Sequence, residues 1–247
     1  MHTGSIRLFV SEALEAGASL LATPAQAHQL GTVMRLAAGE PLRLFNGRDG
    51  EWLARFRPIG KGKAALDVGE RLRSQAAEPD LWLAFAVLKR DATDLVVQKA
   101  TELGASAILP VFTRRSVAHR VNLDRWRAIA TEAAEQCERL TVPRVAEPAE
   151  LPALLHGWPA GRPLFAAIER SAAQPLAAHA GAAGLLVGPE GGYAPEEVEL
   201  LSRHPFVEDV SLGPRILRAE TAAIVGLALL QAGQGRRMDD HARGADR

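Results

Sequence analysis

The pattern of apolar and polar positions changes along the chain, and the change separates two regions. Over residues 41–73 apolar and polar residues alternate between glycine-containing turns such as Asn46-Gly47 and Asp49-Gly50. Alternation of this kind is typical of strands joined by tight hairpins. A short helical pattern over residues 24–36 precedes them. We therefore expect a small β-rich unit that closes as a barrel or a curled sheet.

From residue 81 onward, apolar runs of strand length alternate with segments of helical spacing. The predicted strands are 81–89, 105–113, 162–169, 183–188 and 206–213, and the predicted helices are 91–104, 122–140, 195–204 and 215–233. This alternation favours a parallel sheet covered by helices on both faces. The polar, proline-containing segment 73–80 reads as the linker between the two regions.

Composition narrows the class of protein. The chain has 247 residues, of which 47% are hydrophobic and 23% charged, values typical of a globular protein with a sizeable core. We expect no membrane span, because no apolar run has the required length, and no signal peptide, because the N-terminus lacks its features. The single cysteine, Cys137, excludes an internal disulfide framework and fits a reducing compartment. We expect a cytoplasmic protein.

Charge is balanced overall but not locally. The formal net charge is zero, while residues 114–127 contain five arginines and one aspartate. Most clusters of this kind are solvated surface, although an RNA-contacting patch would have the same composition.

Several kinds of site are disfavoured. The histidines and Cys137 lack metal-ligand spacing, so we expect no metal centre. The chain contains no Gly-x-Ser-x-Gly turn and no Walker phosphate loop. Covalent hydrolase chemistry and P-loop nucleotide hydrolysis are therefore not indicated.

Two glycine-edged loops follow predicted strands. Residues 186–192 read Leu-Val-Gly-Pro-Glu-Gly-Gly, and residues 210–223 lead from a strand into a mostly apolar helix that carries Arg218 and Glu220 at its start. Each loop is compatible with an ordinary turn. A charged pair at the start of a buried helix, however, calls for an ion pair or a ligand, and ligands of parallel sheets bind at the carboxyl ends of the strands.

These two loops, with the segments 7–10, 28–40, 94–116 and 125–145, closely resemble the RsmE family of 16S ribosomal RNA (uracil-N3)-methyltransferases of the SPOUT superfamily. The resemblance extends over nearly the whole chain. It implies an α/β protein with an N-terminal PUA-like β-barrel for RNA recognition, residues 1–75, and a C-terminal SPOUT methyltransferase domain with a deep trefoil knot, residues 76–235. Residues 236–247 are expected to be a disordered tail.

The resemblance also implies S-adenosyl-L-methionine as methyl donor, held mainly by main-chain groups of the two loops. The implied cofactor-binding residues are Val187, Gly188, Pro189, Glu190, Gly191, Gly192, Ser211, Leu212, Gly213, Ile216, Leu217, Thr221 and Ala222. On this interpretation the glycines of the first loop remove side chains so that the backbone can touch the adenosine.

The implied reaction is methylation of N3 of one uridine in 16S ribosomal RNA of the small subunit. N3 carries a proton at neutral pH, so a base or a cationic group must assist its loss. Arg218 and Glu220 are the candidate catalytic residues: Glu220 as base, if burial raises its pKa, and Arg218 for negative charge on the base. The alternative is that they pair with each other beside the cofactor. Glu169, at the end of a predicted strand, is a further candidate for the edge of the pocket.

RNA contacts are expected from basic and polar residues in the family-like segments. These candidates are Arg7, His28 and Arg35 in the N-terminal domain and Arg114, Arg115, Gln136 and Arg139 in the catalytic domain. SPOUT enzymes are typically homodimers, so some of these residues are equally compatible with a subunit interface. Two rival functions stay open: a SPOUT methyltransferase acting on a different RNA nucleotide, and a non-catalytic RNA-binding factor of ribosome assembly.

Overall fold

The computed structural model of the protein describes residues 6–117, 121–168 and 173–234. The chain divides into two compact units. The first consists of residues up to Ala77 together with 134–142, and the second of 78–133 and the chain from Pro143 onward. Residues 134–142 thus belong to the N-terminal unit, although they follow the first helices of the other unit in the sequence.

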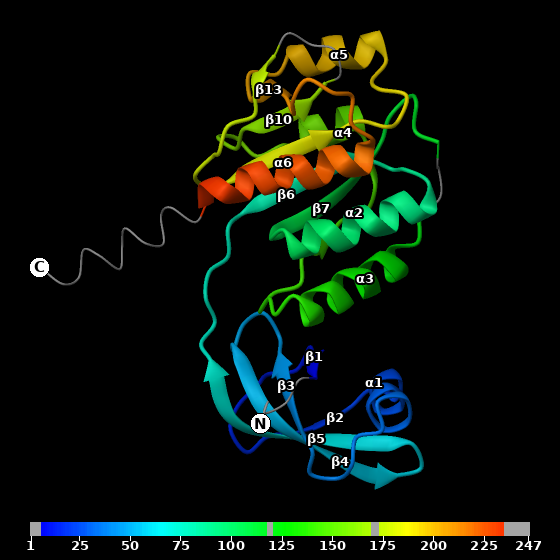
Figure 1. Cartoon of the computed structure of the whole chain (residues 1–247), viewed down its shortest axis with the longest axis vertical. Helices are drawn as coiled ribbons and strands as arrows, with labels where there is room; N and C mark the ends of the chain where they lie inside the picture. Colours follow the sequence, from blue (N-terminus) through cyan, green and yellow to red (C-terminus); the bar gives the residue numbers. More distant parts are fainter. Residues whose placement is uncertain (1–5, 118–120, 169–172, 235–247) are drawn as a thin grey trace, which may run out of the picture. The chain divides into compact units, whose positions relative to one another are not determined.

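The N-terminal unit is built on a five-stranded sheet (Figure 1). Its elements are β1 (Arg7–Phe9), β2 (Ser19–Leu21), α1 (Pro24–His28), η1 (Gln29–Val33), β3 (Pro41–Phe45), β4 (Glu51–Gly60) and β5 (Lys63–Arg73). The strand order is β1-β3-β4-β5-β2, and β1 and β2 do not pair with each other in the described chain. The structure therefore shows an open sheet rather than a closed barrel, with the antiparallel hairpin of β4 and β5 inside the sheet.

The helix predicted over 24–36 is shorter than its sequence pattern. It forms one turn of α-helix, continues as a π-helical turn, and ends before Arg35, whose φ of 57° lies in the left-handed region. A single left-handed residue is a common helix terminator. The buried side chains of Leu30, Leu42 and Leu66 join this segment to the sheet in one hydrophobic core.

The second unit contains an eight-stranded sheet and five helices in its described part. Its elements are β6 (Leu81–Ala86), α2 (Arg90–Glu102), β7 (Ala105–Phe112), α3 (Leu123–Gln136, whose last residues belong to the N-terminal unit), β8 (Arg144–Val145), β9 (Ala149–Glu150), α4 (Leu151–His156), β10 (Leu164–Ala167), β11 (Gln174–Pro175), β12 (Ala183–Val187), α5 (Pro195–Ser202), β13 (Val207–Ser211) and α6 (Ala219–Gln234). The strand order is β11-β13-β10-β12-β6-β7-β8, with β9 on β7, and every pairing is parallel. The predicted parallel α/β sheet is confirmed.

Strand β12 shows why these strands are apolar along their whole length. Leu186 packs into a core with Leu155 and Trp158 of the α4 region. On the opposite face, Leu185 lies so close to α6 that a Cβ at Gly226 would come within 2.6 Å of its side chain. Helices cover both faces, with α2 and α6 side by side on one of them (Figure 1), and both faces of the strand must therefore be hydrophobic.

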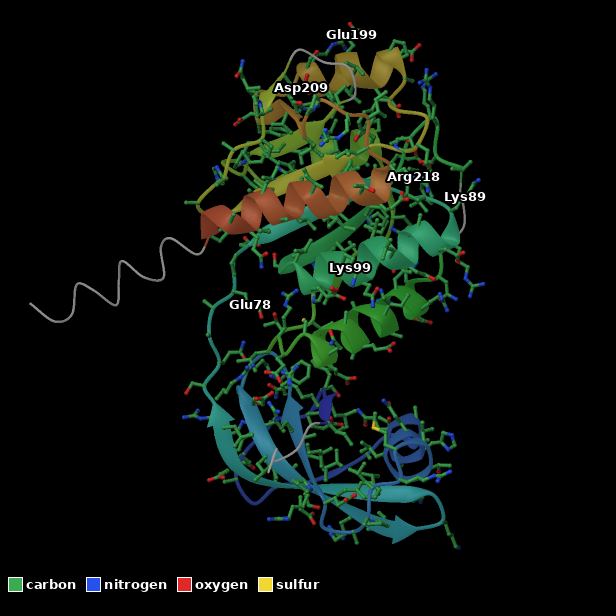
Figure 2. All side chains as sticks on the ribbon, in the orientation of Figure 1. Glu78, Lys89, Lys99, Glu199, Asp209 and Arg218 are labelled. Atoms are coloured by element: carbon green, nitrogen blue, oxygen red, sulfur yellow. The ribbon has the colours of Figure 1, made fainter. Side chains whose placement is uncertain are left out.

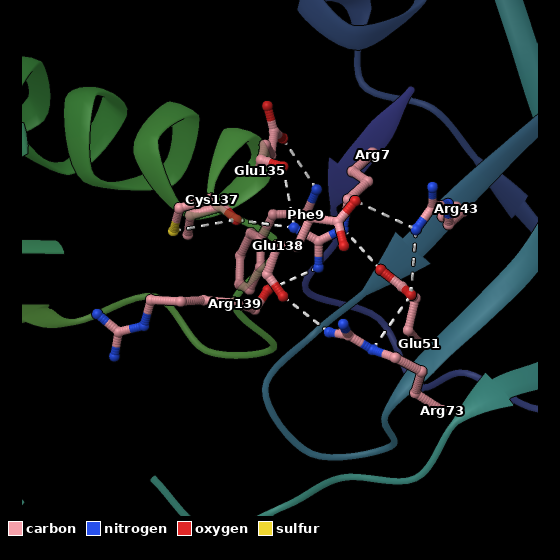
Figure 3. Close-up of polar contacts among 10 residues, drawn as sticks. Arg7, Phe9, Arg43, Glu51, Arg73, Glu135, Cys137, Glu138 and Arg139 are labelled. Atoms are coloured by element: carbon pink, nitrogen blue, oxygen red, sulfur yellow. Dashed lines mark hydrogen bonds and ion pairs between the residues drawn. The ribbon is translucent and has the colours of Figure 1, made fainter. Parts of the chain in front are cut away.

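Within the N-terminal unit, Arg7 is part of a buried charge cluster (Figure 3). Its Nε donates to Glu51 Oε1 at 2.6 Å, and the two side chains are 2% and 1% exposed. The remaining guanidinium nitrogens donate to the carbonyl oxygens of Ala134, Glu135 and Arg139. The guanidinium also lies 4.3 Å from the centre of the Phe45 ring.

The prediction that Arg7 binds RNA is therefore corrected. A guanidinium that is buried, and whose donors are engaged by one carboxylate and three carbonyl oxygens, has no face left for a phosphate. Arg7 instead holds residues 134–139 against the strand that carries it.

Candidate active site

A cavity lies where three neighbouring strands of the second unit end. Strands β13, β10 and β12 are adjacent and parallel, and Ala167 is paired with Val187 on one side and with Val210 on the other. Their carboxyl ends thus meet at one edge of the sheet, where ligands of such sheets bind. The cavity at this edge has a volume of about 160 Å³.

Both glycine-edged loops and the start of α6 line this cavity. The lining residues are Ala167, Ile168, Val187, Gly188, Pro189, Glu190, Gly192, Tyr193, Val210, Ser211, Leu212, Gly213, Pro214, Arg215, Ile216, Leu217, Ala219 and Ala222. Of the cofactor-binding residues expected from the sequence, Gly191 and Thr221 are the two that do not line it. The structure thus brings together two loops that are separated in the sequence by residues 193–209.

The three glycines of the first loop have three different surroundings. A Cβ at Gly188 would lie 2.9 Å from the Tyr193 ring, whereas a Cβ at Gly191 would touch the Arg115 side chain at 3.5 Å. Gly192 has a φ of +67° and open space beside it. Gly188 thus makes room for a tyrosine, whereas the contact at Gly191 is one that an added methyl group would tolerate. The open space that the sequence-based explanation requires, for close approach of a ligand, is found beside Gly192.

Tyr193 is a lining residue that the sequence analysis did not identify. Its hydroxyl is buried and has no hydrogen-bond partner among the described residues. Burial raises the pKa of the phenol well above its ordinary value, and the neighbouring Glu197 carboxylate adds to the shift. The hydroxyl therefore remains protonated throughout the physiological pH range and keeps its capacity to donate a hydrogen bond.

Arg218 and Glu220 do not themselves line the cavity, although Ala219, which lies between them in the sequence, does. Figure 2 shows Arg218 at the N-terminal end of α6, where its carbonyl oxygen accepts the Ala222 N–H at 2.8 Å. Arg218 is exposed and Glu220 is half-buried. No ion pair joins these two residues in the described chain, so the alternative in which they pair with each other is not what the structure shows.

The remaining RNA candidates differ in accessibility. His28, Arg35, Arg114, Arg115 and Gln136 are exposed, and Arg139 is half-buried, with its Nη2 donating to Thr141 Oγ1. Gln136 and Arg139 belong to the segment that groups with the N-terminal unit, not to the surrounding catalytic chain. Arg115 Nη1 donates to the carbonyl oxygen of Gly191 at 2.7 Å, which places this arginine on the glycine loop itself.

The cavity residues that the sequence analysis missed share a recognisable origin. Ala167 is the last residue of β10, the strand between the two loop-bearing strands, Ile168 follows it, and Val210 is the penultimate residue of β13. Strand order, which the amino-acid pattern does not specify, makes β10 the centre of the site. Glu169, the other candidate at this strand end, lies outside the described residues.

Neither a metal-binding cluster nor a membrane-spanning helix is found in the described chain. No group of three or more His, Cys, Asp or Glu side chains there is arranged to hold a metal ion. No helix in the same residues combines the length and apolar character needed to cross a membrane.

Comparisons with known proteins match both units. The family profile described as RNA methyltransferase domain matches residues 76–231, and the profile described as RNA methyltransferase PUA domain matches residues 22–68. Ribosomal RNA small subunit methyltransferase E of Rickettsia conorii is 34% identical over 228 residues, which is 90% of this chain and 93% of the relative. The Synechocystis protein of the same name is also 34% identical, over 92% of this chain and 77% of the relative.

Solved structures of similar proteins also match this chain over most of its length. Ribosomal RNA small subunit methyltransferase E from Neisseria gonorrhoeae, bound to S-adenosyl methionine, superposes with a TM-score of 0.84 at 28% identity and covers 93% of this chain and 98% of its own. A methyltransferase from Legionella pneumophila in complex with the same cofactor has a TM-score of 0.83 at 31% identity, covering 93% and 98% of the two chains. This chain therefore belongs to the RsmE family of ribosomal RNA small subunit methyltransferases.

Proposed function

We propose that the protein transfers the methyl group of S-adenosyl-L-methionine to N3 of a specific uridine in 16S ribosomal RNA of the small ribosomal subunit. The observation that carries this proposal is the cavity lined by both glycine-edged loops at the carboxyl ends of three adjacent strands. Family membership makes the protein an RNA methyltransferase, and the cavity supplies the place for its donor.

The residues at the cavity fit this cofactor. Apolar walls from Val187, Leu217 and Ala222 suit an adenine ring, and the exposed loop backbone supplies groups for hydrogen bonds to its edge. The open space beside Gly192 admits a ligand close to the main chain. Glu190 places a carboxylate at the same cavity, where it complements a cationic ligand. When bound, S-adenosylmethionine supplies an already activated methyl group, so positioning is the main task left to the protein.

Arg218 and Glu220 are proposed to assist loss of the uridine N3 proton. Glu220 accepts that proton, and the exposed Arg218 guanidinium stabilises the negative charge that then spreads onto O2 and O4 of the base. Their location on either side of Ala219, which lines the cavity, supports these roles.

Residues 1–75 are proposed to act as a PUA-like RNA-recognition domain built on the open sheet, and residues 76–235 as a SPOUT methyltransferase domain with a deep trefoil knot. His28, Arg35, Arg114, Arg115, Gln136 and Arg139 remain the proposed RNA contacts, and Arg7 is removed from that set. Arginine binds phosphates or stacks on a splayed base, and exposure of most of these side chains supports the assignment.

A homodimer that acts in the cytoplasm completes the proposal. On the loop that lines the cavity, Ile216 is 64% exposed, and Leu229 of α6 is also exposed. Large apolar side chains exposed on the surface are suited to cover by a second subunit. Sedimentation equilibrium of the purified protein tests this part separately from activity.

The decisive experiment is nucleoside mass spectrometry of small ribosomal subunits from cells that lack this enzyme, after incubation with the protein and S-adenosylmethionine. We expect new 3-methyluridine. A different methylated nucleoside would keep the cofactor and reject the proposed substrate atom. No methylation by a protein that binds the cofactor would favour a non-catalytic assembly factor.

A further inference from the structure

A tight turn after β7 carries two of the exposed arginines. The Thr113 N–H donates to Ser116 Oγ at 2.9 Å, and the Ser116 N–H donates to the Thr113 carbonyl oxygen at 3.0 Å. Thr113 and Ser116 are buried, whereas Arg114 and Arg115 are exposed. The turn is therefore anchored at both ends and presents two guanidinium groups to solvent.

The carboxylate of Glu197 fastens this turn to the glycine-rich loop. Glu197 is only 7% exposed. Its Oε1 accepts the backbone N–H of Arg114 at 2.8 Å, and its Oε2 accepts the backbone N–H of Ala194 at 2.8 Å. Hydrogen bonds to a buried carboxylate are among the stronger ones in proteins, so one side chain fixes the backbones of both loops.

Arg115 makes a second link, at the other part of the same loop. Its Nη1 donates to the Gly191 carbonyl oxygen at 2.7 Å, and its aliphatic stem lies against Gly191. The neighbours of Gly191 on both sides, Glu190 and Gly192, line the cavity. The other donors of this guanidinium, which has five N–H groups in all, make no hydrogen bond in the described chain, and the side chain is exposed.

We propose that the Thr113–Val117 turn couples RNA binding to cofactor binding. Arg115 holds an RNA phosphate and the Gly191 carbonyl oxygen at the same time. Glu197 is the positioning residue that keeps the turn and the loop in a fixed relative position. This inference rests on the proposed function. A phosphate bound by Arg115 restrains the cofactor loop, and a cofactor in the cavity restrains Arg115. The two ligands therefore raise each other's affinity by the same factor, since coupling between binding sites is reciprocal.

The test measures the dissociation constant of labelled S-adenosylhomocysteine by equilibrium dialysis, with and without saturating small ribosomal subunits from cells that lack this enzyme. For the native protein we expect affinity to rise about fivefold or more with subunits, the lower range of measured couplings. Glu197→Gln keeps the shape of the side chain but turns an NH₂ group toward one of the two backbone N–H groups. We expect it to reduce the enhancement to less than about twofold.

Glu196→Gln is the matched control, because Glu196 lies in the same first turn of α5 and is exposed; its enhancement should equal that of the native protein. Arg115→Ala, a surface change, supplies a second test if Glu197→Gln does not fold, and should abolish the enhancement at saturating subunits. Native protein that methylates subunits but binds S-adenosylhomocysteine equally with and without them would overturn the coupling and leave the proposed function intact. The coupling is equally overturned if Glu197→Gln weakens binding while the enhancement persists.

Discussion

Arginine and glutamate side chains come together in two regions of this protein, with different consequences. In the N-terminal unit, Arg7, Arg43 and Arg73 approach the buried carboxylate of Glu51 at 2.6, 3.7 and 3.3 Å (Figure 3). In the other unit, Arg218 and Glu220 flank the cavity-lining residue Ala219 at the start of α6, and no ion pair joins them in the described chain. In the first region the buried carboxylate is neutralised by arginines of the protein itself, whereas Arg218 and Glu220 are left for a ligand.

The difference lies in burial rather than in residue type. A charge removed from water must be paired and hydrogen-bonded, as Arg7 is by Glu51 and three carbonyl oxygens. Arg218 is exposed and keeps its hydration until something displaces it. Arginine in a family-like motif is therefore a structural residue in one place and a candidate catalytic residue in the other.

Removal of the Glu51 carboxylate should produce the largest effect. Glu51→Ala leaves the Arg7 guanidinium buried beside no counter-charge, and we expect the unfolding free energy of the N-terminal unit to fall by about 3–5 kcal/mol. Urea unfolding followed by the fluorescence of Trp52, the sole tryptophan of that unit, measures this. Glu138→Gln is the control: its exposed carboxylate pairs with Arg43 at 3.6 Å, and its loss should cost less than about 1 kcal/mol. Equal effects of the two changes would refute the structural role of the buried cluster.

Arg218→Ala tests the second of the two regions, the charged residues beside Ala219. Because its side chain has no ion pair to lose in the described chain, the fold should be unaffected, while kcat for subunit methylation falls about 10²-fold or more. Affinity for S-adenosylhomocysteine should change less than about twofold. Single-turnover methylation and equilibrium dialysis together give both quantities. Similar losses of kcat and cofactor affinity would make Arg218 a binding residue.

Substitution of neighbouring glycines sharpens the assignment of the cavity. The added methyl group of Gly188→Ala would lie 2.9 Å from the Tyr193 ring, and overpacking of this kind costs about 1–3 kcal/mol. We expect S-adenosylhomocysteine binding to weaken by about tenfold, since displaced Tyr193 lines the cavity. Gly191→Ala meets only the Arg115 stem at 3.5 Å and should bind within about twofold of the native protein. The reverse order of the two variants would contradict the observed packing.

The smallest expected effect concerns an exposed pair in the N-terminal unit. Hydrogen bonds from Arg57 and Ser19 lower the pKa of Asp67 from 3.8 to about 2. Because the pKa is lower in the folded state, the stabilisation is complete above pH 4 and is lost as the pH falls toward 2. Asp67→Asn should flatten this part of the stability profile, measured by urea unfolding from pH 4 to pH 2. A slope unchanged by the substitution would assign the acid sensitivity to other carboxylates.

Local sequence patterns predicted most elements of the second unit, because their signals are local. Continuous apolar runs marked β6, β7, β10 and β12, and the two glycine-edged loops were correctly placed at strand ends. Prediction was weaker where the backbone leaves a regular path. The expected helices over 24–36 and 122–140 both end early, near the left-handed residues Arg35 and Glu138. Arginine and glutamate rarely adopt this conformation, so the sequence did not predict it.

The sequence by itself determined how the main strands and helices follow one another along the chain, the parallel sheet, the family and the two loops that form the cavity. Each of these depends on periodicity or on contiguous motifs. Tertiary structure alone decided which charged residues are structural. Arg7 reaches Glu51 across 44 positions and the Ala134 carbonyl oxygen across 127, and Glu197 accepts the Arg114 backbone N–H across 83 positions. Burial and hydrogen bonding depend on such distant partners, and they separate the buried Arg7, held by a carboxylate and three carbonyl oxygens, from the exposed arginines proposed to bind RNA.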